Sequence, residues 1–259
     1  LSQAPGHENH KAGGHNTFIG SNSGDGAYAT TTAVENMTAL GSGTLSGALT
    51  GAANGAVAVG SYSLNALSSG AGNTAVGFFA GTAITSGDKN VAIGFEALKS
   101  LTTGDNNIAI GYQALLDGNT SETDNIAVGA YALQNMDDGN STKNIAIGTS
   151  VMLGVSGAAI TNNTAVGYEA MKGVATASGT TALGASALYA LTDGTGNTAV
   201  GYTALTANTV GNYNTAVGYQ ALDDANDNSD NTAVGYQALT VAHHGTLNYG
   251  WNTAVGSLA

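Results

Sequence analysis

The sequence predicts an all-β fold, a repetitive parallel β-roll or β-solenoid of about fourteen coils of 17–21 residues. Three observations lead to this prediction: one phrase recurs along the chain, its copies keep a minimum spacing, and the residues within it alternate. The phrase stands in full as Asn-Thr-Ala-Val-Gly-Tyr-Gln-Ala-Leu from Asn231 to Leu239. A phrase repeated at this spacing is typical of stacked coils that each form one structural unit.

The spacing follows from the glycine that closes the Asn-Thr-Ala-Val-Gly part of each copy. Successive glycines lie 17 residues apart at the least and 21 at the most, so each longer interval reads as an insertion into one coil. The fourteen marker glycines are Gly20, Gly41, Gly60, Gly77, Gly94, Gly111, Gly129, Gly148, Gly167, Gly184, Gly201, Gly218, Gly235 and Gly256. We therefore expect a polar N-terminal leader at residues 1–15 and a repeat rod at residues 16–259.

The alternation within each phrase predicts a short strand that ends before the marker glycine. The residues on either side of the central Ala are Thr, Val, Ile or Leu, as in Ile108-Ala109-Ile110. We expect the Thr, Val and Ile row to look inward, and the Ala row to be buried against another backbone, as at Ala199, Ala216 and Ala233. A Leu or Met four residues after eleven of the fourteen marker glycines, such as Leu115, predicts a second buried row.

The start and the corner of each coil also carry a pattern. The Asn that opens the phrase predicts a ladder of side-chain amides, with members at Asn73, Asn90, Asn107, Asn125, Asn144, Asn163, Asn197, Asn214, Asn231 and Asn252. The Tyr or Phe after the marker glycine predicts a stacked aromatic row. A Gly three residues before the Asn predicts a tight left-handed corner, at Gly70, Gly87, Gly104, Gly194 and Gly211. Insertions at 117–124, 137–143 and 242–249 are expected on the same rim.

Composition excludes several classes of protein. The chain has 39 Gly, one Pro, no Cys, five Lys, no Arg and a net charge of −12. Nucleic-acid binding needs clustered basic charge, so we expect no nucleic-acid partner. No apolar run reaches the length of a membrane-spanning helix, so we expect no membrane insertion by this segment. Because the chain begins at Leu1 without a leader, we interpret it as a piece of a longer protein.

The phrases Asn-Val-Ala-Ile-Gly at Asn90 and Asn-Ile-Ala-Ile-Gly at Asn107 and Asn144 resemble the head repeats of trimeric autotransporter adhesins. The longer Asn-Thr-Ala-Val-Gly-Tyr-Gln-Ala-Leu form also resembles repeats of phage and viral tail fibres. The resemblance covers nearly everything from Asn16 to Ala259. It implies a left-handed parallel β-roll in an intertwined homotrimer, located outside the cell, on a cell surface or on a virion.

The residues themselves also favour an oligomer, because a coil with an Ala-only face encloses only a thin core. Three chains that pack on their Ala faces would solve this problem. A monomeric solenoid and a filament assembled end to end remain alternatives.

Few residues suggest a ligand site. Four acidic residues in one turn offer oxygen ligands for structural calcium: Asp223, Asp224, Asp227 and Asp230. The longest insertion and its flank form a candidate binding loop with His243, His244, Tyr249 and Trp251. His7, Glu8, His10 and His15 have a metal-like spacing, although we favour a frayed polar leader or tag-like segment as their explanation. No other cofactor is expected.

No set of residues converges on catalysis, so we expect a protein without enzymatic activity. The leading hypothesis is a structural or adhesive fibre segment, a viral tail fibre or bacterial adhesin shaft, whose rim loops meet a receptor or glycan. The alternatives are a subunit of an extracellular filament and an ice-binding or other ligand-binding solenoid. An ice-binding face needs an exposed row of Thr, and the expected inward orientation of that row argues against it.

Overall fold

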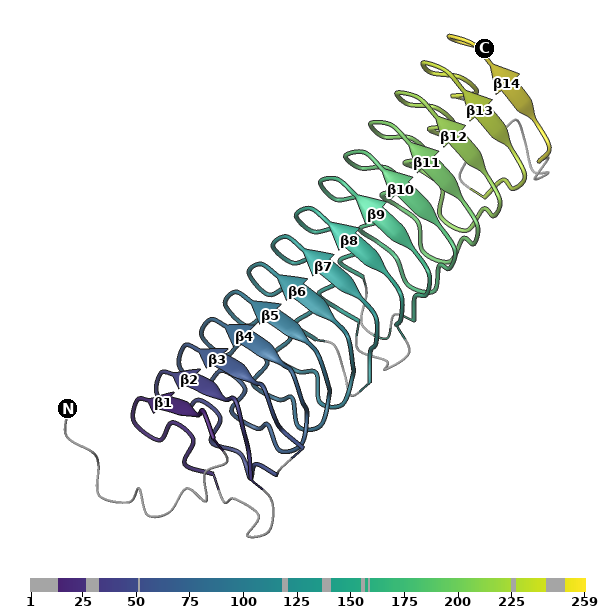
Figure 1. Cartoon of the computed structure of the whole chain (residues 1–259). Coiled ribbons are helices and arrows are strands. Elements are labelled where there is room, and N and C mark those ends of the chain that lie inside the picture. The colour runs from purple at the N-terminus through teal and green to yellow at the C-terminus, as the bar shows by residue number, and fades with distance from the viewer. Residues whose placement is uncertain are drawn as a thin grey trace. The chain divides into compact units, whose positions relative to one another are not determined.

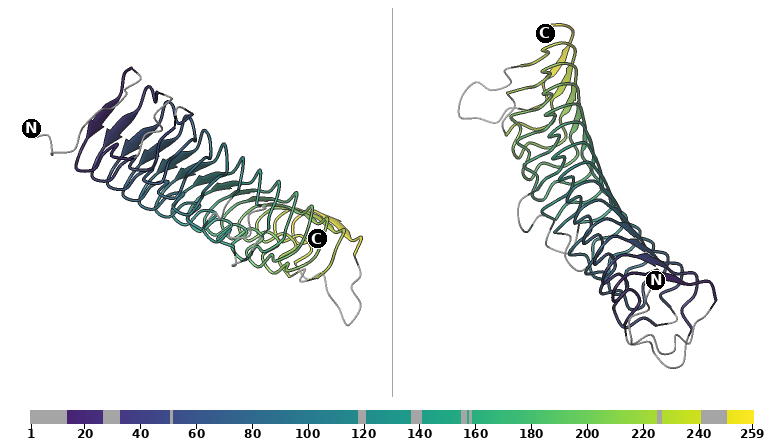
Figure 2. Two further views of the ribbon diagram at one scale, coloured as in Figure 1. Left: turned by 90° about the horizontal axis from the view of Figure 1, so that it is seen from below. Right: turned by 90° about the vertical axis from the view of Figure 1, so that its left-hand side faces the viewer.

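The computed structural model of the chain consists of parallel strands joined by tight turns, and its described residues contain no helix (Figure 1). It describes residues 14–26, 33–50, 52–117, 121–136, 141–154, 157, 159–224, 227–240 and 250–259. The chain divides into two compact units, unit 1 at Leu1–Asp124 and unit 2 at Asn125–Ala259. The strands of each unit are stacked along one side of its coils (Figure 2). The predicted all-β parallel solenoid is confirmed.

Every strand is three residues long and coincides with the Thr-Ala-Val part of the phrase. Unit 1 contains β1 (Thr17–Ile19), β2 (Thr38–Leu40), β3 (Val57–Val59), β4 (Thr74–Val76), β5 (Val91–Ile93) and β6 (Ile108–Ile110). Unit 2 contains β7 (Ile126–Val128), β8 (Ile145–Ile147), β9 (Thr164–Val166), β10 (Thr181–Leu183), β11 (Thr198–Val200), β12 (Thr215–Val217), β13 (Thr232–Val234) and β14 (Thr253–Val255).

Within each unit, each strand pairs with the next strand along the chain in the same register. Val91 lies opposite Ile108, Ala92 opposite Ala109 and Ile93 opposite Ile110. A parallel pair needs a connection of a dozen residues or more, which one coil supplies without a helix. The register therefore places equivalent residues of successive coils directly above one another, and every row in the sequence becomes a row in space.

The core of each coil is narrow and is closed by small side chains of the same chain. The central Ala of the strands is buried from β2 to β13, and a second Ala row, which includes Ala97 and Ala204, is buried as well. The predicted Leu and Met row completes this core from Leu45 to Leu222, while Leu239 is partly exposed. Burial of the Ala row and of these Leu and Met residues is confirmed.

The predicted orientation of the Thr, Val and Ile row is wrong. These residues flank the buried Ala, and alternation along a strand places them on the opposite, outer face. Ile93 and Ile110 are each 37% exposed. The expected packing of three chains on their Ala faces is also wrong, because Ala199, Ala216 and Ala233 lie fully inside the coil of their own chain. The narrow coil explains both errors, since its interior accepts one methyl group where Val would not fit.

The left-handed corners differ from the predicted ones. The residue just before the ladder Asn adopts positive φ, as at Gly72, Lys89 and Asn106, whereas Gly87 three residues before the Asn does not. Position 87 requires Gly for a steric reason instead, because a Cβ there would overlap the carbonyl oxygen of Gly104 in the next coil. The same steric constraint, a clash between an added Cβ and a carbonyl oxygen of the next coil, applies at Gly70, Gly104, Gly194 and Gly211.

Replacing Ala199 by Leu should destabilise unit 2 by about 1–3 kcal/mol or more, because the coil has no space for the added atoms. Tyr202→Phe, which changes a half-exposed ring, should alter the free energy of unfolding by about 0.5 kcal/mol at most. Urea unfolding of both variants measures the difference. Equal free energies for the two variants would contradict the buried position of Ala199.

Candidate functional site

The most prominent exposed feature of unit 1 is an apolar strip on the outside of its strands. We define the sheet face of unit 1 as the first and third residues of β3–β6, which are Val57, Val59, Thr74, Val76, Val91, Ile93, Ile108 and Ile110. Val76, Ile93 and Ile110 each expose 37% of their surface. The face carries no charge, and Thr74 is its one polar residue. Contiguous exposed apolar surface of this kind usually marks an interaction site.

An aromatic row continues this strip beyond the marker glycines. In unit 1 the rings of Phe78 and Phe95 stack with centroids 5.8 Å apart, and those of Phe95 and Tyr112 with centroids 5.2 Å apart. These three rings are 40–45% exposed. The predicted stacking of the aromatic row is confirmed here, and it widens the apolar surface next to the sheet face.

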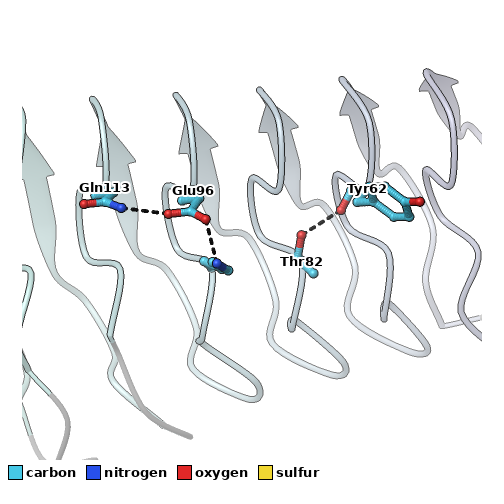
Figure 3. A network of polar contacts seen from close by, with 5 residues as sticks. Tyr62, Thr82, Glu96 and Gln113 are labelled. Carbon is cyan, nitrogen blue, oxygen red and sulfur yellow. Dashed lines mark hydrogen bonds and ion pairs between the residues drawn. The ribbon is translucent and has the colours of Figure 1, made fainter.

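A charged pair lies in the turn after the aromatic row. Glu96 Oε1 accepts a hydrogen bond from Lys99 Nζ at 2.6 Å, and Glu96 Oε2 accepts one from Gln113 Nε2 at 2.7 Å. Figure 3 shows the second bond, together with the bond from Thr82 to the backbone oxygen of Tyr62. Lys99 also lies over the Phe79 ring, 5.4 Å from its centroid. Because the opposite charges of Glu96 and Lys99 cancel, the pair adds no net charge beside the aromatic row.

The hydrogen bonds from Lys99 and Gln113 lower the pKa of Glu96, and burial opposes this shift weakly. A carboxyl whose pKa is lowered in the folded state stabilises the fold at neutral pH. That contribution is lost as the pH falls from the unfolded-state pKa through the folded-state pKa.

We expect Lys99→Met to raise the pKa of Glu96 toward its ordinary value, because its strongest hydrogen-bond donor is removed. A carboxyl-detected NMR titration of Glu96 measures the shift. Lys89→Met, at a corner of the coil, serves as the control and should leave the Glu96 titration unchanged. A titration that is identical in the parent chain and the Lys99 variant would contradict the assigned cause.

Unit 2 repeats both features with different residues. Tyr202, Tyr219 and Tyr236 form a stack with successive centroids 5.4 Å apart. Lys172 Nζ donates a hydrogen bond to Glu169 Oε1 at 2.6 Å, and this bond raises the pKa of Lys172.

The Asn ladder is confirmed in both units. Asn90 donates its backbone N–H and its side-chain amide to Asn73 Oδ1, at 2.9 and 3.1 Å, and donates the amide also to the backbone oxygen of Gly104 at 2.8 Å. Asn107 repeats the pattern on Asn90, and Asn144, Asn163, Asn214, Asn231 and Asn252 use the ladder residue before them. Where the sequence has Thr180, its backbone N–H still bonds to Asn163 Oδ1. The ladder is a structural element without a need for a ligand.

A second polar ladder was missed by the sequence analysis. Asp88 Oδ1 accepts the backbone N–H of Ala71, and Asp105 Oδ1 accepts that of Asp88, each at 2.7 Å. In unit 2, Asn212 and Ser229 accept backbone N–H groups in the same way. The available signal was an Asp, Asn or Ser two residues before the ladder Asn.

The candidate calcium residues occupy separate places in their turn. Asp223 is partly buried, and desolvation followed by the charge of Asp224 raises its pKa. Asp227 accepts a hydrogen bond from the Thr209 hydroxyl at 3.0 Å, and Asp230 is a left-handed corner residue. Among the described residues, no three His, Asp or Glu side chains form a group that could hold a metal. Structural calcium stays a prediction.

The other candidate residues fall mainly outside the described residues. These are His7, Glu8, His10, His243, His244 and Tyr249. His15 has a positive φ of 72°, and Trp251 is 85% exposed at the corner before β14. Of the insertions expected on the rim, 242–249 lies wholly outside the described segments, and so do residues 118–120 and 137–140 of the other two.

Within the segments that the structure describes, no helix is long and apolar enough to cross a membrane. Comparison of the chain with protein-family models, curated proteins and solved structures found no match.

Proposed function

We propose that the chain is a non-enzymatic segment of a structural or adhesive fibre that acts outside the cell, on a virion or a bacterial surface. The repetition of one coil geometry supports this role, because each coil is hydrogen-bonded to the next through the same ladders. A rod of this kind can therefore be lengthened by adding coils that make the same contacts. The insertions before the strands then present variable sequence to a receptor or glycan. An end-to-end filament is the alternative assembly.

The observation that carries the proposal is the sheet face of unit 1 with its aromatic row. The core of the coil is complete within one chain, and yet large apolar side chains remain on the outside. Covering them would stabilise an assembly by roughly 25 cal/mol per Å² of apolar surface removed from water. An acidic chain associates with its own copies most readily through a neutral surface, and this face carries no charge. We therefore assign the homotrimer contact to this face in place of the Ala row.

Native mass spectrometry of the full chain at low concentration tests the assembly. We expect a mass three times 25.4 kDa. Ile110→Lys should shift the chain to the single-chain mass, since it would bury a charge in the apolar contact. Ser100→Lys adds the same charge at an exposed turn and should leave the trimer intact. A single-chain mass for the parent protein would overturn the homotrimer, and a series of increasing masses would favour the filament.

A glycan array and a cell-binding assay with the full chain test the adhesive role. Binding that survives Ile110→Lys would assign adhesion to surfaces other than the assembly face. A trimer that binds neither glycans nor cells would restrict the proposal to a structural shaft.

A further inference from the structure

Unit 2 carries a row of outward hydroxyl groups that no other described residue of the chain uses as a hydrogen-bond partner. We define the threonine row as the first residues of β9–β14, which are Thr164, Thr181, Thr198, Thr215, Thr232 and Thr253. Each lies directly opposite the next in the parallel register. Within the described part of the chain, their hydroxyls make no hydrogen bond. The row therefore retains its full capacity to bond to a partner outside the coil.

Several other Thr hydroxyls of the same unit are hydrogen-bonded within the coil. Thr192 Oγ1 donates to the backbone oxygen of Thr209 at 3.0 Å, and Thr206 Oγ1 donates to that of Ser186 at 2.7 Å. Thr180 replaces an Asn in the buried ladder. The hydroxyls of these residues stabilise the coil through hydrogen bonds. The hydroxyls of the threonine row make no such bond to another described residue.

The chemistry of the row is periodic in two directions. Its hydroxyl and methyl groups repeat along the unit at about 4.8 Å, the spacing of neighbouring strands. The third residues of the strands form a parallel aliphatic row about 6.6 Å away, at two residues along each strand. That row consists of Val166, Leu183, Val200, Val217, Val234 and Val255. From Thr164 to Val255, no residue of either row is charged.

Rigid, regularly spaced hydroxyl and methyl groups suit a periodic partner better than a flexible one. Thr and Val are stiff at χ1, so little side-chain freedom remains to be lost on binding. The strand spacing is close to the repeat of water molecules along the a axis of hexagonal ice. Hydroxyls can bond into such a lattice while the methyl groups occupy its open positions. The absence of charge in both rows disfavours nucleic acids and acidic or basic peptides as partners.

We infer that the threonine row and its aliphatic neighbour form an ice-binding face on β9–β14. The main objection from the sequence was the expected inward orientation of the Thr row, and the outward orientation in the structure removes it. The face occupies unit 2, whereas the proposed assembly contact occupies the sheet face of unit 1, so the two inferences rest on different residues.

Thermal hysteresis of the full chain, measured by nanolitre osmometry together with ice-crystal shape, tests the inference. We expect hysteresis and faceted crystals with the parent protein, and loss of most of the hysteresis in Thr215→Tyr, whose ring would protrude from the centre of the row. Thr176→Tyr adds the same ring at an exposed Thr outside the strands and should retain the activity. Thr215→Val keeps the shape, removes one hydroxyl and should lower the hysteresis only partly.

The absence of hysteresis in the parent protein would overturn the ice-binding face and would leave the fibre proposal standing. Equal loss in the Thr215 and Thr176 variants, with unchanged melting temperatures, would also overturn it. If the parent protein lacks hysteresis and Thr215→Tyr reduces the native mass, the face is covered by a second copy of the chain. That result would refute ice binding and extend the assembly contact into unit 2.

Discussion

Replacing Gly218 by Ala should be among the most destabilising single-methyl changes in unit 2, at about 3–5 kcal/mol. Gly218 has a φ of +141°, which L-residues with a side chain rarely adopt. A Cβ there would overlap the carbonyl oxygen of Gly235 and lie 2.6 Å from its carbonyl carbon. The clash involves backbone of the next coil, so no side-chain rotation relieves it. Urea unfolding monitored by circular dichroism gives the change in the free energy of unfolding.

Gly179→Ala provides the matched control. Gly179 also has a positive φ, +62°, but a Cβ would meet no atom within 4 Å. Its replacement should cost only the left-handed backbone penalty of about 1–2 kcal/mol. If both Ala variants unfold at the same urea concentration, close approach between coils is not what requires the marker glycines.

Replacing Asn214 by Ala should cost about 2–5 kcal/mol, because a buried ladder residue loses several hydrogen bonds at once. Asn214 Oδ1 accepts the backbone N–H and the side-chain amide of Asn231, each at 3.0 Å, and its own amide donates to the backbone oxygen of Asn228 at 2.7 Å. The variant leaves the buried N–H of Asn231 without this acceptor. Hydrogen exchange of the Asn231 amide should become faster, and urea unfolding gives the free-energy change.

Asn214→Thr distinguishes the ladder bonds from the loss of side-chain volume. Thr180 already occupies an equivalent place, where its hydroxyl oxygen accepts the backbone N–H of Asn197 at 3.4 Å. We expect Asn214→Thr to recover part of the stability lost in Asn214→Ala. Identical stabilities of the Thr and Ala variants would show that the ladder hydrogen bonds contribute little.

Much of the fold could be predicted because each structural row is also a row in the sequence. The strand positions, the burial of Ala199 and Leu205, and the bonds of Asn214 all follow from one repeated phrase. Periodicity shows which residues share a face. It does not show which of the two faces lies inside the coil.

That missing information caused the main errors. A single-methyl row is equally consistent with a narrow interior and with a contact between chains, and the width of the coil decides between them. The predicted left-handed corner at Gly87 is wrong and the positive φ belongs to Lys89, because Gly can indicate either positive φ or a close backbone approach. The surface open to another chain is therefore the outer face of the strands and not the buried Ala row.

The constant register between neighbouring coils has a consequence for how such a gene can change. Removing residues 198–214 would join Asn197 to Thr215 and restore the same Asn-Thr-Ala-Val junction that the chain already uses. Replication slippage by one repeat would thus delete or duplicate a complete coil. The coils that become neighbours would still pair in the same strand register. Variation in coil number is therefore open to selection without passing through a misfolded intermediate.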